Sequence, residues 1–431
     1  MEVFSIAILL FSFLLLLTTG TPVAWSIIIS SLFTLLVSVP FLPALTTISQ
    51  RMATGIDSFA LLAIPFFILS GELMNKGGVA HRLVAFAKAL VGFLPGGLAL
   101  INVISAMLMG SVAGSAMASA SAMGSILGPE MEKEGYSKGF GVAINITSAT
   151  TGLVIPPSNI LIVYSLASGG ASIAALFLAG YIPGILTGLF LMAVAMIWAK
   201  KKNFKTGKRA PLKTVFSSFV RAFPSLMLLF VVIGGIVSGV FTATEASAIA
   251  VIYTLVLGFV YKEITFKTLP TILLKSSTTT AIVMFLIGAS MSMSWVLSYE
   301  NIPEMISSGI LSLSDNKIVI LLLINFTLLF VGIFMDMTPA VLIFTPIFLP
   351  IVAQLGIDPV HFGIIMILNL CIGLCTPPVG SVLFVGVGVA NTSIQKVIKP
   401  LIPLFLAMIV ALLLVTYIPA LSLWLPSIFD L

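Results

Sequence analysis

Long apolar runs recur along the chain, and short polar or basic stretches separate them. The clearest runs are 3–17, 186–198, 226–240, 318–334 and 401–415. They approach or reach the roughly 20 residues that a helix needs to cross the hydrocarbon core of a bilayer. They do not alternate apolar and polar residues in segments of about ten, as the strands of a membrane β-barrel do. The pattern therefore predicts an all-α protein that crosses a membrane several times.

The composition supports this interpretation, because 59% of the 431 residues are hydrophobic and 8% are charged, against about 25% charged in soluble domains. Seven of the 20 Lys and Arg residues lie between 200 and 213 with no acid among them. This bias predicts a cytoplasmic loop, so the net charge of +6 reports topology. The loop is short and flanked by apolar runs, and we expect no nucleic-acid partner. Glu2 and an apolar run in place of a basic leader predict a retained first span.

Enzymatic chemistry has little support in the sequence. His81 and His361 lie far apart, and neither belongs to an H-E-x-x-H zinc motif. No phosphate-binding G-x-x-x-x-G-K-[ST] loop occurs. Cys371 and Cys375, the two cysteines, lie four residues apart in an apolar run, where small packing residues are expected rather than a redox pair. We therefore expect no enzyme, although an intramembrane enzyme that brings a nucleophile and a base together stays an alternative.

The chain contains an internal repeat with an offset of 221 residues. The basic loop, at 200–222, separates a first half at 1–199 from a second at 223–431. A double proline and several glycines recur at this offset, which predicts two structural repeats. The matched pairs are Pro129 and Pro350, Gly135 and Gly356, Gly152 and Gly373, Leu153 and Leu374, Pro156 and Pro377, Pro157 and Pro378, Ser172 and Ser393, and Ile173 and Ile394.

Each half contains an apolar stretch that small residues or prolines interrupt, at 110–129 and at 332–350. Two half-length arms around such a centre predict a re-entrant helical hairpin, at about 98–130 in the first half and about 332–355 in the second. An ordinary span whose small residues allow close helix packing is the alternative.

A longer apolar segment with a central double proline follows each hairpin, at about 139–168 and about 360–392. Two adjacent prolines remove two backbone donors and disfavour helix just before them, so each segment predicts a broken helix. The freed carbonyls are tolerated at membrane depth only where protein, ions or a wet cavity face them. Two such breaks at matching positions favour a binding site over a structural kink.

Oxygen-bearing side chains cluster beside the predicted breaks, and they suit a transporter site. Half-helix N-termini favour an anion, and exposed carbonyls bind a hard cation such as sodium. Asp336 stands out because intramembrane acids are functional candidates, although it could be only a helix cap. Glu72 and Glu245 are expected to tie helix ends or packed interfaces together, and Arg51 to anchor the chain at the membrane interface. For the transported anion we predict contacts with Ser115, Asn145, Ser158, Asn159, Asp336 and Gly380.

Five segments resemble the large membrane subunit of the tripartite ATP-independent periplasmic (TRAP) transporters, and the resemblance covers nearly the whole chain. It implies an elevator transporter of the bacterial inner membrane, with inverted repeats and a transport domain that moves past a scaffold. It also implies coupling to two or more sodium ions, a small four-helix membrane subunit, and a periplasmic binding protein that delivers an organic acid, such as a C4-dicarboxylate or sialic acid. The segments are 50–74, 110–129, 152–164, 239–248 and 356–384.

The resemblance also implies the sodium contacts, which fall on the hairpins and the breaks. Thr150 and Thr151 stand where small Ser and Gly residues are common in the family, which puts the first ion site in doubt. The alternatives are a sodium and anion symporter of related hairpin architecture that needs no binding protein, and a channel. The implied sodium contacts are Ser111, Gly114, Ser115, Thr150, Thr151 and Gly152, then Gly332, Asp336, Thr338, Gly373 and Thr376.

Overall fold

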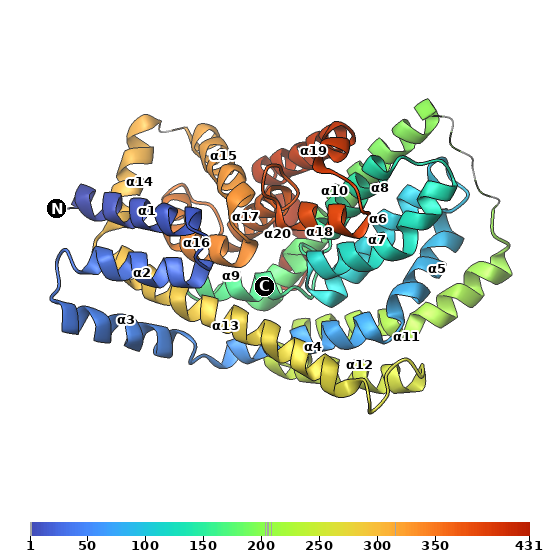
Figure 1. The fold of residues 1–431 in the computed structure, drawn as a ribbon, viewed down its shortest axis with the longest axis horizontal. Coiled ribbons are helices and arrows are strands. Elements are labelled where there is room, and N and C mark those ends of the chain that lie inside the picture. The colour runs from blue at the N-terminus through green and yellow to red at the C-terminus, as the bar shows by residue number, and fades with distance from the viewer. Residues whose placement is uncertain (1, 203, 205–206, 208, 315) are drawn as a thin grey trace.

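The computed structural model describes residues 2–202, 204, 207, 209–314 and 316–431. All regular structure in these ranges is helical (Figure 1). Eight of the described helices are long and apolar enough to cross a membrane, which confirms the predicted all-α membrane class. They are Phe59–Lys76, Ile173–Lys202, Leu212–Val237, Ala243–Val260, Leu269–Tyr299, Lys317–Phe334, Met337–Gln354 and Ile394–Tyr417.

The helices of the first half end with the long α10, whose last turn carries Lys200 to Lys202 of the predicted basic loop. Of the rest of that loop, Asn203, Lys205, Thr206 and Lys208 lie outside the described residues. The elements are α1 (Glu2–Thr18), α2 (Val23–Leu35), α3 (Phe41–Gly55), η1 (Phe59–Leu62), α4 (Ala63–Lys76), α5 (Val79–Val91), α6 (Gly97–Ala113), α7 (Ala116–Lys133), α8 (Lys138–Thr151), α9 (Asn159–Ala167) and α10 (Ile173–Lys202).

The helices of the second half repeat the order of the first. In particular, α16 begins and ends 221 residues after α7, and α17 begins 221 residues after α8. The two halves therefore share element boundaries, while an inverted relation between them stays a prediction. The elements are α11 (Leu212–Val237), α12 (Ala243–Val260), α13 (Leu269–Tyr299), α14 (Ile302–Leu313), α15 (Lys317–Phe334), α16 (Met337–Gln354), α17 (Pro359–Gly373), α18 (Ser381–Val389), α19 (Ile394–Tyr417) and α20 (Ala420–Ile428).

Two helix pairs with tight turns carry the interrupted stretches. The first pair, α6 and α7, turns at Gly114, whose φ of 59° suits glycine, and at Ser115, whose hydroxyl accepts a hydrogen bond from the Ala118 amide at 3.3 Å. The second pair, α15 and α16, turns at Met335 and Asp336. Its first arm thus begins at Lys317, ahead of the range 332–355 expected for the hairpin. That arm contains no breaker, so its sequence reads as a plain span.

The helices pack in two groups around these hairpins. In the first group, α13 packs against α2, α3 and α4, and α12 packs against α4 and α11. In the second, α6 and α7 pack on α8, α15 and α16 pack on α17, and α10 and α19 cover α8 and α17. Figure 1 shows α3, α13, α4 and α12 along one edge of the molecule, with α15, α17, α19 and α10 on the other side. Contacts between the groups include α4 with α6 and α13 with α16.

The first halves of the broken helices form the centre of the molecule. Every residue from Val142 to Thr151 in α8 and from His361 to Gly373 in α17 is buried. These two helices touch each other at matching repeat positions, because the Cys371 thiol donates to the Thr150 carbonyl oxygen at 3.2 Å, 221 residues away. Both cysteines are buried and unpaired, as expected of packing residues.

Candidate substrate and ion site

Both double prolines interrupt helices as the sequence indicates. The irregular segment 152–158 separates α8 from α9, and 374–380 separates α17 from α18. Some freed backbone groups bond within the break, such as the Leu153 amide to the Thr150 carbonyl at 3.1 Å. In the second half, the Gly380 amide reaches across to the carbonyl of Ile333, near the end of α15, at 3.3 Å. This bond ties the second break to its hairpin.

Each hairpin touches its break through a pair of glycines. A Cβ atom built on Gly152 would lie 2.6 Å from the Cα atom of Gly110, and one built on Gly373 would lie 2.6 Å from the Cα atom of Gly332. Carbon atoms pack best at about 3.5–4.0 Å, so neither contact has room for a side chain. The backbones of hairpin and break are therefore in direct contact in both halves.

A cavity of about 440 Å³ lies where the two hairpin tips meet. Both tips, both broken helices, α4 and α13 contribute to its wall, so it joins the two halves and the two packing groups. Its polar and charged lining residues are Glu72, Asn75, Ser115, Ser121, Asn159, Lys275, Thr279, Asp336, Thr338 and Ser381.

Asp336 connects the second hairpin with the second half of the broken helix. It occupies the N-cap position of α16, its side chain is exposed, and it lines the cavity. The Ser381 hydroxyl, at the first residue of α18, donates to Asp336 Oδ1 at 3.5 Å. The carboxylate thus lies at two helix N-termini, where partial positive charge stabilises an anion. Asp336 is a cap by position, and it also faces the cavity.

The hydroxyl groups beside the breaks are arranged as hard-cation ligands require. Thr376 donates to the Ile372 carbonyl at 2.8 Å, Thr151 to the Ser148 carbonyl at 2.6 Å, and Ser111 to the Leu108 carbonyl at 2.9 Å. Because each hydroxyl hydrogen is already directed to its own helix, the oxygen lone pairs can bind a cation. Among the described residues, no three His, Cys, Asp or Glu side chains cluster, so hydroxyl and carbonyl oxygens would have to bind it.

The structure brings some predicted substrate contacts together and separates others. Ser115, Asn159 and Asp336 line the cavity, and Asn159 packs on Gly114, since a Cβ atom there would lie 3.0 Å from Asn159 Nδ2. Asn145 does not line this cavity. Its amide nitrogen donates to the Ala120 carbonyl at 2.7 Å and holds α8 against α7, which gives it a packing role instead of the expected substrate contact.

Two other predicted contacts lie in the breaks and not in the cavity wall. Ser158 is buried at the end of the first break, and its hydroxyl has no hydrogen-bond partner among the described residues. Gly380 is the last residue of the second break, and its φ of 26° suits glycine. Both positions support the breaks, and neither is part of the lining.

Sequence reasoning missed Lys275, which pairs with Glu72 across the cavity wall. The Lys275 Nζ atom lies 2.9 Å from Glu72 Oε2, and the two side chains are 59% and 13% exposed. Of the lining residues that the structure describes, Lys275 is the one with a positive charge. An isolated lysine within the long apolar and hydroxyl-rich run of α13 is the signal that could have identified it. The pair also ties α4 to α13, as expected for Glu72.

The two other charged residues singled out from the sequence lie away from the cavity wall. Glu245 forms a capping box with Thr242 at the start of α12, so it ties a helix end together as expected. Arg51 stacks over the Trp295 ring at 4.9 Å from its centroid, which fixes α3 to α13.

Known proteins match this chain over nearly its whole length. The family model described as "Tripartite ATP-independent periplasmic transporter, DctM component" matches residues 10–421. The chain belongs to this family. It is therefore a subunit of a membrane transporter and not an enzyme. Membership implies partnership with a small membrane subunit and a periplasmic binding protein.

Relatives in several bacteria support this assignment. The Salmonella typhimurium protein YgiK is 56% identical, over 99% of this chain and 98% of its own. The isethionate TRAP transporter permease DctMQ of Oleidesulfovibrio alaskensis is 41% identical, over 96% of this chain and 65% of its own. The C4-dicarboxylate TRAP transporter large permease DctM of Pseudomonas aeruginosa is 41% identical, over 86% of this chain and 87% of its own.

A solved transporter has a similar fold. The crystal structure of the Alcanivorax borkumensis YdaH transporter matches with a TM-score of 0.65 and 14% identity, over 91% of this chain and 90% of the other. At this identity the likeness concerns the fold alone, and it places the chain among membrane transporters.

Proposed function

We propose that this chain imports an organic acid across the bacterial inner membrane together with sodium ions, receiving the acid from a periplasmic binding protein. The observation that carries the proposal is the cavity at the hairpin tips. Two hairpins, two broken helices and the carboxylate of Asp336 meet there, and a single lysine supplies positive charge. Broken helices that converge on a polar cavity are the usual site of secondary transporters.

Sodium is the ion that the donor set favours, because hydroxyl and carbonyl oxygens suit a hard cation. One ion would lie between the first hairpin and break, near Ser111, Thr150 and Thr151, and another between Asp336 and Thr376 in the second half. An ion that bridges hairpin and break holds both in place before the anion arrives. The ordering cost is then met by sodium binding, which makes the two solutes bind cooperatively.

The movement that carries the site across the membrane would be of the elevator type. The hairpins and broken helices pack on each other and on α10 and α19, and they meet α4 and α13 at the cavity. We assign the first set to the moving domain and α2–α4 with α11–α13 to the scaffold. A rigid-body shift between the two would expose the cavity first to one side of the membrane and then to the other.

The cargo class follows from charge and from the relatives. The relatives' printed names include isethionate and C4-dicarboxylates, and both are small organic anions. Lys275 offers an ammonium group to such an anion, and the N-termini of α9 and α16 offer backbone amides. We propose that the cargo is an organic acid of the C4-dicarboxylate or sialic acid class.

Reconstitution tests this function. The organic acid that most raises the melting temperature of the cognate binding protein serves as the labelled substrate, in proteoliposomes that contain this chain and its small subunit. We expect uptake only with the binding protein outside and an inward sodium gradient. Equal uptake with choline in place of sodium would overturn the coupling. Uptake without the binding protein would favour the simpler sodium and anion symporter, and uptake without saturation would indicate a channel.

A further inference from the structure

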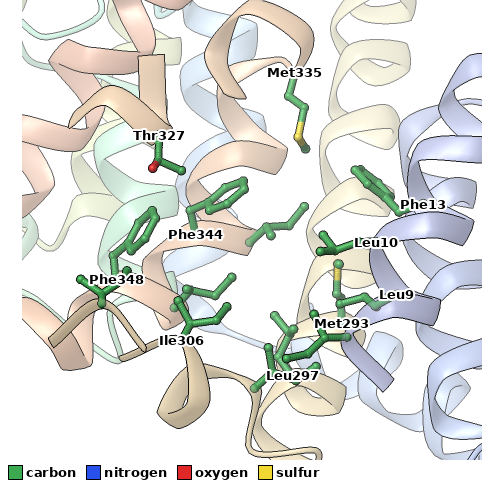
Figure 2. Close-up of a pocket in the computed structure, with 15 residues that line it drawn as sticks. Leu9, Leu10, Phe13, Met293, Leu297, Ile306, Thr327, Met335, Phe344 and Phe348 are labelled. Carbon is green, nitrogen blue, oxygen red and sulfur yellow. The ribbon is translucent and has the colours of Figure 1, made fainter. Parts of the chain in front are cut away.

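A second cavity lies behind the second hairpin, and it differs from the substrate cavity in its lining. It measures about 300 Å³ and is bounded by α1, α13 and α14 on one side and by α15 and α16 on the other (Figure 2). The lining residues are Ile6, Leu9, Leu10, Phe13, Met293, Leu297, Ile302, Ile306, Ile310, Thr327, Met335, Ile343, Phe344, Ile347 and Phe348.

Water is a poor occupant of this cavity. Thr327 supplies the one hydroxyl of the lining, and that hydroxyl already donates to the Leu323 carbonyl at 2.9 Å. A buried water needs two to four polar partners, and apolar cavities of this kind stay dry and accept apolar ligands. An empty cavity would leave fifteen side chains without van der Waals partners on one side. The occupant that fits is therefore a hydrocarbon.

The position of the cavity indicates the source of that hydrocarbon. Three of the wall helices, α13, α15 and α16, are membrane-spanning candidates, so the cavity lies at the depth of lipid tails. Leu10 lines the cavity and is still 54% exposed, and its neighbours Phe11 and Leu14 are 70% and 58% exposed. The cavity is thus continuous with the outer apolar face of α1, from which a lipid tail can enter.

We propose that this cavity holds one fatty acyl chain of a bilayer lipid, inserted between α1, α13 and α14 and the arms of the second hairpin. The chain would lie against Phe344 and Ile347 of α16 and reach Met335 in the hairpin turn. Met335 directly precedes Asp336, which lines the substrate cavity. The lipid tail therefore fills the space behind the tip that carries the proposed sodium ligand.

Quenching by brominated lipids tests this proposal. The four native tryptophans are replaced by Phe, and single reporters are introduced as Phe344→Trp in the cavity, Phe326→Trp on the exposed face of α15, and Phe177→Trp in the core. Phe326 is 71% exposed and Phe177 is fully buried. The complex with the small subunit is measured in vesicles of phosphatidylcholine whose acyl chains carry two bromine atoms. We expect Phe344→Trp to lose at least half as much fluorescence as Phe326→Trp.

A cavity-filling variant separates the cavity from the outer surface. Leu9→Phe, combined with Phe344→Trp, adds volume inside the cavity and should reduce the quenching of that reporter at least twofold. Quenching no greater than that of Phe177→Trp would overturn the proposal, and so would a helix of the small subunit that fills the cavity and gives the same result. Quenching that persists unchanged in the filled variant would show that the bromine atoms act from outside, which also overturns it. Unchanged melting temperatures confirm that each variant is folded.

Discussion

The contact between Gly332 and Gly373 makes a sharp prediction for the substitution Gly373→Ala. The new Cβ atom would lie 2.6 Å from the Gly332 Cα atom, and carbon atoms need about 3.5–4.0 Å. The second hairpin and its break must then separate by about 1 Å. Ligands in a binding site tolerate errors of about 0.5 Å, so the oxygens of Asp336 and Thr376 can no longer bind one sodium ion together.

The size of the effect follows from the cost of overpacking. Forcing one methyl group into a packed contact costs about 1–3 kcal/mol. If the cost falls on the sodium-bound state, sodium binding weakens roughly 5- to 150-fold, since about 1.4 kcal/mol is tenfold. The assay is the sodium concentration for half-maximal uptake in proteoliposomes. Sodium-dependent stabilisation of the purified chain against heat provides a second measurement.

The matched control is Gly388→Ala, in α18 of the same broken helix. No atom lies within 4 Å of a Cβ atom built there, and Ala favours a helix over Gly by up to about 1 kcal/mol. We expect Gly388→Ala to keep the sodium requirement of the unsubstituted chain and to raise the melting temperature slightly. A normal sodium requirement in folded Gly373→Ala would refute the assignment of sodium to this hairpin and break.

Three further substitutions test other parts of the site. Asp336→Asn removes the carboxylate but keeps the volume, and we expect the sodium requirement for uptake to rise at least about tenfold; an unchanged requirement would remove Asp336 from the ion site. Lys275→Gln should raise the KM for the organic acid about tenfold, while Glu72→Gln frees the ammonium group and should lower the KM; the opposite order would exclude Lys275 as an anion contact. Thr242→Ala removes half of the capping box at α12 and should cost about 1 kcal/mol of stability, measured by thermal unfolding, with no change in sodium requirement.

The breaks and the repeat could be predicted because their causes are local. A double proline interrupts a helix wherever it occurs, so the positions of 156–157 and 377–378 suffice to place both breaks. Small residues around Gly114 likewise indicate the first turn, because glycine adopts a positive φ readily. The same signals recur 221 residues later, which is why the shared helix boundaries were already visible in the sequence.

Features that depend on packing could not be predicted. Lys275 and Glu72 lie 203 residues apart, and no local rule pairs them. Asn145 has the right chemistry for a substrate contact, but the packing of α7 on α8 directs its amide to Ala120. The start of α15 was missed because an unbroken apolar run gives no indication that it pairs with the next helix. The apolar cavity depends on the shapes of side chains from five helices.

The most direct test of the account is a high-resolution electron cryomicroscopy structure of the complex in sodium with its organic acid. We predict density for the acid in the cavity between Ser115, Asn159 and Asp336, with ion density between each hairpin and its break. The same preparation in potassium should lose the ion density and the acid together. Acid density at another place in the chain, or acid density that persists unchanged without sodium, would contradict the account.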